Sequence, residues 1–173
     1  MSTEWKSILP EEIDENIFSL IGQEWMLITA GTSDSFNTMT ASWGGFGVLW
    51  RKNVSFCFVR PNRYSFSYMN DANYYTLSFF PQSYRRVLTY CGEYSGRDVD
   101  KVKETGITPF DPGYGTVGFS EAKMIIVCRK LYFQDFDNSN FLVEGIEDLY
   151  PEKQYHRMYI GEICECRLRT MQD

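Results

Sequence analysis

Asn37-Thr38-Met39-Thr40-Ala41-Ser42-Trp43 is the stretch from which both the fold and the chemistry of this chain can be argued. If the segment is extended, successive side chains point to opposite sides, so its hydroxyl residues share one face and its apolar residues the other. The first set is Thr38, Thr40 and Ser42, and the second is Met39, Ala41 and Trp43. This predicts a strand that hydrogen-bonds on one face and packs on the other. The same pattern is also typical of a half-buried strand whose threonines face water.

The residues before this stretch predict a hairpin. Residues 24–30 form a continuous apolar strand pattern, and the turn-forming cluster at residues 31–35 leads directly into Asn37. The two strands should therefore pair as antiparallel neighbours. Alternating or aromatic-rich runs predict further strands at residues 53–59, 74–80, 123–134, 141–148 and 159–168.

Helix signals lie between these strands. Residues 10–21 have an apolar stripe at helical spacing and end at Gly22. A second helix is predicted over residues 63–71, with Asn62 as its cap. The third helix should open at Ser95 and run to about residue 105, because Ser95-Gly-Arg-Asp98 resembles a capping box.

The order of these elements predicts the architecture. The glycine-rich residues 44–47 lack the spacing of a dinucleotide-binding loop and predict a flexible turn. About six strands and three short helices without regular βαβ alternation indicate a mainly β, largely antiparallel barrel rather than a doubly wound fold. The length of 173 residues suits a single domain over residues 1–173.

Composition excludes several classes of partner. The net charge of −6 argues against a general nucleic-acid or anionic-membrane surface, since both require clustered Lys and Arg. No apolar run approaches the roughly 20 residues needed to span a bilayer, and the start of the chain lacks a signal-peptide pattern, so we expect a cytoplasmic protein. Aromatic residues make up 17% of the chain and must fill a core, a pocket or a subunit interface.

Metal and disulfide chemistry are not predicted. The five cysteines lack metal-site spacing and are expected to be reduced thiols, and His156 is the only histidine. These cysteines are Cys57, Cys91, Cys128, Cys164 and Cys166.

Three segments together indicate one ligand, a planar polar ring system with a phosphate tail. Hydroxyl and backbone groups of residues 37–42 could bond a ring edge or a ribityl chain, and Trp43 could pack on the rings. The helix start near Ser65 and the pair Arg97 and Lys101 could bind phosphate. FMN meets this description. Taken singly, the last two segments are equally typical of a capped surface helix and an exposed helical face.

The chain resembles the flavin reductase-like, FMN-binding split-barrel family, and most closely its flavoredoxin-type branch. The motifs that carry the resemblance are Asn37-Thr-Met-Thr-Ala-Ser-Trp-Gly-Gly45, Val59-Arg-Pro-Asn-Arg-Tyr-Ser65, Thr76-Leu-Ser-Phe-Phe80, Cys91-Gly-Glu-Tyr-Ser-Gly-Arg-Asp-Val-Asp-Lys101 and Tyr155-His-Arg-Met-Tyr-Ile-Gly-Glu-Ile163. The resemblance implies a split, Greek-key-like barrel, bound FMN, and a homodimer with the flavin near the subunit boundary.

The resemblance also implies roles for individual residues. Asn37, Thr40, Ser42 and Trp43 would surround FMN, and Ser65 and Lys101 would lie near its phosphate. Ser65 stands where relatives often carry Thr, so the hydroxyl is kept. Arg60, Arg63 and Arg97 are added on electrostatic grounds, and His156 is a candidate contact for a pyridine nucleotide or substrate. The full set of candidate cofactor-binding residues is Asn37, Met39, Thr40, Ala41, Ser42, Trp43, Arg60, Arg63, Tyr64, Ser65, Arg97 and Lys101.

The expected function is that of a redox flavoprotein. It would accept hydride from NADH or NADPH at flavin N5 and pass electrons to a second flavin or another acceptor, without a catalytic side chain. Two alternatives use the same binding residues. One is an FMN electron carrier that exchanges electrons with protein partners, and the other is a non-redox binding module on the same barrel.

Overall fold

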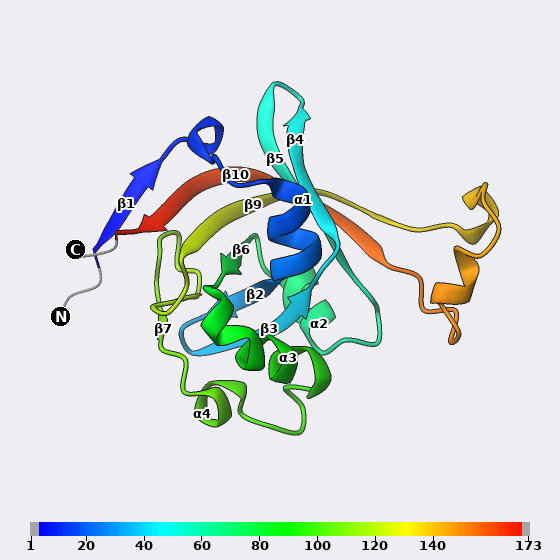
Figure 1. Cartoon of the computed structure of the whole chain (residues 1–173). Coiled ribbons are helices and arrows are strands. Elements are labelled where there is room, and N and C mark those ends of the chain that lie inside the picture. Colours follow the sequence, from blue (N-terminus) through cyan, green and yellow to red (C-terminus); the bar gives the residue numbers. More distant parts are fainter. Residues whose placement is uncertain (1–3, 171–173) are drawn as a thin grey trace.

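The computed structural model, which describes residues 4–170, is organised around one large antiparallel sheet (Figure 1). The sheet has eight strands in the order β3-β2-β6-β9-β10-β5-β4, and β1 also pairs with β10. A separate two-stranded sheet joins β7 and β8. The strands are β1 Trp5–Ile8, β2 Met26–Thr32, β3 Ser35–Ala41, β4 Gly44–Leu49, β5 Lys52–Val59, β6 Tyr74–Phe79, β7 Pro109–Phe110, β8 Gly118–Phe119, β9 Met124–Asp135 and β10 Arg157–Arg169. The mainly β class predicted from the sequence is confirmed.

The sheet closes on itself into a split barrel. Strands β3 and β4 stand at opposite ends of the strand order, yet only residues 42–43 connect them. Ala41 and Gly44 are joined by three Cα–Cα steps, which span at most about 11 Å, so the two ends of the sheet must lie side by side. Since β3 and β4 are not hydrogen-bonded to each other, this connection marks a seam in the barrel wall. Trp43 lies at that seam.

The longest strand, β10, joins the rest of the sheet. One of its edges pairs with β9, while the other pairs with β5 over residues 157–162 and with β1 over residues 166–169. The hairpin β9–β10 therefore separates β5 from β6, although these strands follow each other in the sequence. This crossing gives the barrel its Greek-key-like character.

Short helices cover one end of the barrel. The α-helices are α1 Ile17–Ser19, α2 Ser65–Asp71, α3 Arg85–Glu93 and α4 Lys101–Thr105. The π-helix η2 spans Leu20–Glu24, and the 3-10 helices are η1 Pro10–Glu12, η3 Gln82–Tyr84, η4 Asn138–Asn140 and η5 Glu147–Leu149. Helix α3 packs against β3 and α4, and α2 packs against β2 and β3 (Figure 1). Strand β3 is thus the element on which α2 and α3 converge.

The core has two parts. The larger fills the barrel and includes the fully buried side chains of Tyr75, Phe79 and Tyr159. The smaller packs Leu88 and Cys91 of α3 against the outside of the sheet, together with Leu27 and Phe119. Burial of these apolar side chains fixes α3, and with it the backbone that follows Leu88, against β3.

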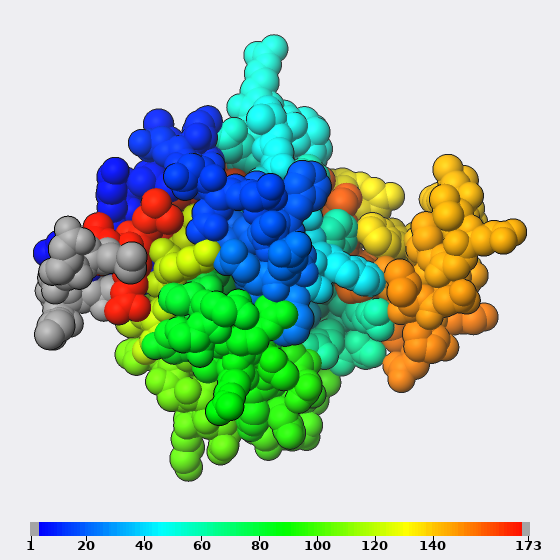
Figure 2. Space-filling model, viewed as in Figure 1, coloured from blue at the N-terminus to red at the C-terminus, as the bar shows by residue number. Residues whose placement is uncertain are grey.

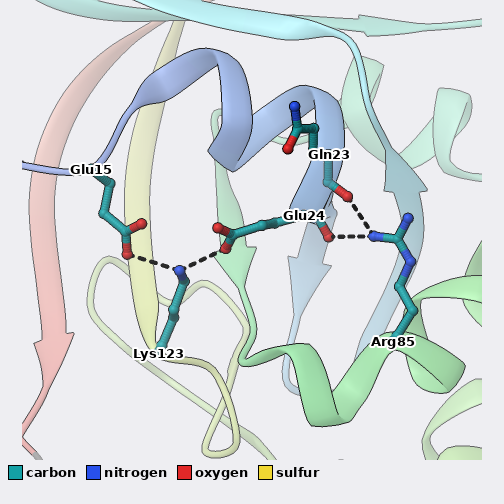
Figure 3. A network of polar contacts seen from close by, with 5 residues as sticks. All are labelled: Glu15, Gln23, Glu24, Arg85 and Lys123. Atoms are coloured by element: carbon teal, nitrogen blue, oxygen red, sulfur yellow. Dashed lines mark hydrogen bonds and ion pairs between the residues drawn. The ribbon is translucent and has the colours of Figure 1, made fainter.

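A polar network fixes the entry into β2 (Figure 3). The Lys123 Nζ atom lies 2.8 Å from Glu15 and 2.7 Å from Glu24. Arg85 donates to the carbonyl oxygens of Gln23 and Glu24, and its guanidinium lies 3.2 Å from the ring centroid of Trp25. Trp25 has a φ of 73°, a conformation that costs energy for a bulky residue and needs such support.

The predicted first helix is wrong in its extent. Instead of one helix over residues 10–21, the chain forms a 3-10 turn, a short α-helix and a π-helix. The cause is Asn16, whose Oδ1 accepts hydrogen bonds from the backbone of Phe18 and Ser19 and so starts the helix at Ile17. The apolar residues Leu20 and Ile21 are buried, as their spacing predicted.

The other two predicted helices start later than expected. Helix α2 begins at Ser65, and Asn62 does not cap it but donates to Glu152. Helix α4 begins at Lys101 because Asp100 caps the backbone of Lys103, so Arg97 and Lys101 do not share a helical face. The predicted end near residue 105 is confirmed, since α4 ends at Thr105 and is followed by Gly106 with a left-handed φ of 72°.

One turn prediction and one strand prediction are also wrong. Residues 44–47 are not a flexible turn but the first part of β4, paired with β5. A side chain at Gly44 would place a Cβ 2.9 Å from the carbonyl oxygen of Phe56, so the glycine reflects close packing. Residues 141–148 are not a strand; this segment is irregular, with Gly145 at a φ of 86° and the 3-10 helix η5 at its end. The hairpin of β2 and β3 is confirmed.

Candidate functional site

The candidate site lies along the unpaired edge of β3. Strand β3 pairs with β2 on one side, and no strand of the described residues pairs with its other edge. The Thr38 hydroxyl is buried and lies 2.8 Å from that of Thr29, while the Thr40 hydroxyl donates to the Leu88 carbonyl. Two of the three hydroxyls are therefore bound within the protein. The strand can offer its backbone edge to a ligand as well as its side chains.

A first cavity lies at the barrel seam. It has a volume of about 280 Å³. Its lining residues are Met39, Thr40, Ala41, Ser42, Trp43, Phe58, Arg60, Asn62, Arg63 and His156. The Trp43 side chain is 42% exposed and its ring centroid lies 5.0 Å from that of His156. A large aromatic ring beside an open cavity can pack on a flat ligand.

A second cavity of about 160 Å³ continues the first, since Met39, Asn62 and Arg63 line both. The residues that line this second cavity are Asn37, Met39, Asn62, Arg63, Tyr64, Ser65, Glu93, Tyr94, Ser95, Gly96, Arg97 and Lys101. In it, the Asn37 Nδ2 atom donates to Ser65 Oγ at 2.7 Å, and both side chains are buried. A wider hollow of about 660 Å³ adjoins it and shares Asn37, Gly96, Arg97 and Lys101.

Four cations line the two cavities, although the chain carries a net charge of −6. Within residues 4–170, none of Arg60, Arg63, Arg97 or Lys101 forms an ion pair with a carboxylate. Glu93 also lines the second cavity without pairing with any of them. Positive charge left uncompensated at a cavity favours an anionic ligand there.

All four of these cations donate to backbone carbonyls. Arg63 donates to the Gly92 carbonyl at 2.8 Å, and burial, with the nearby charge of Arg60, lowers the Arg63 pKa. The Lys101 Nζ atom donates to the carbonyls of Thr38 at 2.7 Å and Cys91 at 2.8 Å. An ammonium group has three N–H donors, so one remains for a ligand.

Burial shifts the proton equilibrium of Lys101. The side chain is 6% exposed, and its desolvation lowers the pKa from 10.5 to about 8. The charge of Arg63 contributes in the same direction. A phosphate at this position would favour the charged ammonium, so ligand charge and Lys101 protonation should be coupled.

The opposite end of the first cavity contains His156. Burial, followed by the charge of Arg60, lowers its pKa to about 4, so the imidazole is uncharged at neutral pH. Arg60 itself is anchored, since it donates to the Leu149 carbonyl at 2.9 Å and lies 5.0 Å from the ring centroid of Tyr150.

All twelve candidate cofactor-binding residues of the sequence analysis line one of the two cavities, and His156 lines the first. The lining residues outside the predicted set are Phe58 and Asn62 in the first cavity and Asn62, Glu93, Tyr94, Ser95 and Gly96 in the second. Residues 93–96 lie within the motif of residues 91–101, which already carried the family resemblance, so their place at the site could have been predicted. Phe58 had no signal beyond its place in a predicted strand.

Comparison with known proteins identifies the family. The sequence profile described as "Flavin reductase like domain" matches residues 18–173, which is most of the chain. The chain belongs to this flavin reductase-like family. No curated protein sequence matches it significantly.

Solved structures resemble the flavin reductase-like chain over nearly its whole length. An FMN-binding domain of a flavin reductases-like enzyme from Shewanella baltica has a TM-score of 0.71 and 11% identity, covering 98% of this chain and 79% of its own. The flavoredoxin of Desulfovibrio vulgaris has a TM-score of 0.68 and 19% identity, covering 96% and 80%. An NADH:FAD oxidoreductase of Streptomyces globisporus has a TM-score of 0.62 and 12% identity, covering 85% and 75%. At such identities the likeness establishes the shared fold.

The part of the flavin reductase-like chain that the structure describes holds no metal-binding cluster and no disulfide. Within it, no three His, Cys, Asp or Glu side chains are grouped so that they could hold a metal ion. All five cysteines are free thiols. No helix between residues 4 and 170 is long and apolar enough to cross a membrane.

Proposed function

We propose that this flavin reductase-like chain binds FMN along β3 and reduces it with NADH or NADPH. The observation that carries the proposal is the convergence of four unpaired cations and an exposed tryptophan on two connected cavities at the edge of β3. FMN is a flat ring with an anionic tail, which matches this arrangement of charge and aromatic surface. Together the two cavities have the size of a small-molecule site, about 300–1,000 Å³.

The residues present fit FMN. The phosphate would lie in the second cavity, where Lys101, Arg63 and Arg97 can neutralise it. The buried pair of Asn37 and Ser65 presents polar groups at the same place. Gly96 leaves space there, because a Cβ on this residue would overlap the Asn37 amide oxygen. A compact cradle with uncompensated positive charge is what a phosphate ester requires.

The ring would lie in the first cavity. Trp43 supplies an aromatic surface at the seam, and Met39 and Ala41 supply apolar contacts from β3. His156 and Arg60 line the far side, where a second ligand could approach. Bound FMN would supply the hydride chemistry, with reduced nicotinamide as the donor. The residues of the chain would hold the two ligands in the orientation that hydride transfer needs and would set the charge and polarity around them.

Anaerobic stopped-flow mixing tests this function. The purified chain loaded with FMN is mixed with NADH or NADPH, and flavin absorbance is followed. We expect bleaching within seconds with at least one nucleotide. If neither nucleotide bleaches the flavin while dithionite does, the chain is an FMN electron carrier instead. If the chain takes up no FMN at all, the site serves another ligand.

Trp43→Ala tests the position of the ring. Loss of the indole should weaken binding of FMN and riboflavin alike, by about 2- to 12-fold, because both carry the same ring and an aromatic contact contributes about 0.5–1.5 kcal/mol. The visible spectrum of the bound flavin should also change. Titration of each flavin by fluorescence quenching measures the two affinities. Phe18→Ala is the control, since Phe18 is an aromatic residue that is 90% exposed and lines neither cavity. Unchanged affinity and spectrum in Trp43→Ala would contradict the ring position.

We also propose that the chain forms a homodimer through the projecting β4–β5 hairpin. Val48 and Trp50 at its tip are 74% and 55% exposed, and the Trp50 ring lies 6.0 Å from that of Tyr132 on β9, itself 42% exposed. Exposed aromatic and apolar side chains gathered in this way are typical of an interface. Sedimentation equilibrium should give twice the chain mass, and a monomer mass would contradict the proposal.

A further inference from the structure

A buried hydrogen bond joins Tyr150 to His156 beside the first cavity. The Tyr150 hydroxyl oxygen lies 2.8 Å from His156 Nδ1, and the two residues are 4% and 8% exposed. The imidazole is also confined by aromatic rings, with the Trp43 centroid at 5.0 Å and the Phe58 centroid at 6.4 Å. Its backbone is fixed as well, because the Phe136 N–H donates to the His156 carbonyl at 2.9 Å. The ring therefore has a defined place and orientation.

The direction of this hydrogen bond follows from the partners available. Within residues 4–170, His156 Nδ1 is the one acceptor within hydrogen-bonding distance of the Tyr150 hydroxyl. A buried O–H that donates to nothing is costly, and burial raises the Tyr150 pKa, so the hydroxyl keeps its proton. The hydroxyl must then donate and Nδ1 must accept. An uncharged imidazole with an accepting Nδ1 carries its proton on Nε2.

Tyr150 is itself held firmly, although it belongs to a segment that stands away from the barrel. Residues 137–155 project from the body as the orange segment of Figures 1 and 2. Arg60 anchors this segment through the Leu149 carbonyl and the Tyr150 ring. The Phe141 ring stacks on Tyr150 at 6.0 Å. The projecting segment thus returns to the site at Tyr150.

We infer that Tyr150 is a positioning residue that fixes His156 in the Nε2–H tautomer and so presents an uncharged N–H donor to the ligand cavity. His156 lines this cavity, and Nε2 has no hydrogen-bond partner within residues 4–170. An uncharged donor suits a carbonyl oxygen of the ligand, whereas Arg60 beside it can serve an anionic group. That the ligand is a reduced nicotinamide rests on the proposed function; the tautomer does not.

Nitrogen NMR of the imidazole tests the tautomer directly. His156 is the only histidine, so ¹⁵N-histidine labelling gives one pair of ring signals. At neutral pH the wild type should show a protonated Nε2 and an unprotonated Nδ1 accepting a hydrogen bond. A proton on Nδ1, or fast averaging between the two tautomers, would overturn the inference without any variant.

Tyr150→Phe keeps the ring that Arg60 and Phe141 contact and removes only the donor. We expect its Nδ1 and Nε2 shifts to move towards each other as the second tautomer becomes populated. Tyr155→Phe is the matched control, because the Tyr155 ring packs 5.2 Å from Tyr150 but its hydroxyl bonds Glu147. A ring signal in Tyr150→Phe that matches the wild type would overturn the inference.

Steady-state kinetics test the use of the Nε2 proton. Tyr150→Phe should raise the KM for reduced nicotinamide by about three- to tenfold, the value of one uncharged hydrogen bond, with the FMN affinity unchanged. Tyr155→Phe should change neither. A shifted tautomer with an unchanged KM would overturn the assignment of Nε2 to the ligand. If no nucleotide reduces the wild type, the proposed function fails while the NMR result stands.

Discussion

Lys101→Met should weaken FMN binding by about 10- to 100-fold and riboflavin binding by no more than about threefold, because a hydrogen bond to a charged group contributes about 1.5–3 kcal/mol. The two flavins differ only in the phosphate, and Lys101 has one N–H free for it after donating to Thr38 and Cys91. Methionine keeps the length and apolar volume of the lysine stem. Isothermal titration with each flavin separates the phosphate contribution from that of the ring.

The same variant has a cost in stability. It leaves the carbonyls of Thr38 and Cys91 without their donor, so the free energy of unfolding should fall by about 1–3 kcal/mol. Lys103→Met is the control, since Lys103 lies on the same helix, is exposed and lines neither cavity. Equal losses for FMN and riboflavin in Lys101→Met would contradict the phosphate role and leave Lys101 as a clamp between β3 and α3.

The lowered pKa of Lys101 leads to a related prediction about the pH dependence of FMN binding. The free protein loses the Lys101 proton as the pH rises through about 8, whereas a bound phosphate retains it. FMN affinity in the wild type should therefore fall above pH 8, while riboflavin affinity stays level. In Lys101→Met that decline should vanish. Affinity measured from pH 6.5 to about 9.5 covers the window over which the ammonium is lost.

The sequence predicted which residues line the site better than it predicted how these residues contact one another. Alternation along residues 37–43 identified β3, since a period-two pattern remains wherever one face of a strand is buried. The strand ends at Ala41, however, and the predicted residues 42–43 form the connection to β4. The alternation did not show that β3 is an edge strand. Edge position depends on which distant strands pair, and here it is set by the order of β2, β6 and β9. The hydrogen bond from Lys101 to the Thr38 carbonyl could therefore not be predicted from the sequence.

The predicted helix starts were wrong for a local reason. Asn and Ser side chains bond neighbouring backbone in turns as readily as at helix caps, so their presence does not fix where a helix begins. Ser95 Oγ accepts from the Arg97 backbone N–H at 3.2 Å and forms such a turn, while Asp100 caps the helix. Helix α3 was missed because its apolar signal is short, with only Leu88 and Cys91 buried.

Gly96→Ala should weaken FMN binding by about tenfold or more, because it disrupts the Asn37–Ser65 hydrogen bond that forms one wall of the second cavity. The new Cβ would overlap the Asn37 amide oxygen and lie 3.0 Å from Asn37 Cγ and 3.1 Å from the Tyr64 ring. The backbone of Gly96 lies outside the left-handed region, so alanine meets no backbone strain there. The effect must therefore come from displaced side chains.

Gly45→Ala is the control that separates this effect from the general cost of replacing a glycine near the site. Gly45 also has no left-handed φ, and a Cβ there meets nothing within 4 Å. It should bind FMN like the wild type. In Gly96→Ala, overpacking should lower the free energy of unfolding by about 1–3 kcal/mol, measured by urea denaturation without flavin. If Gly96→Ala loses that stability yet binds FMN normally, Asn37 and Ser65 support the fold and the phosphate lies against Lys101 and Arg63 alone. Loss of FMN and riboflavin affinity together would instead extend the role of Asn37 to the part that both flavins share.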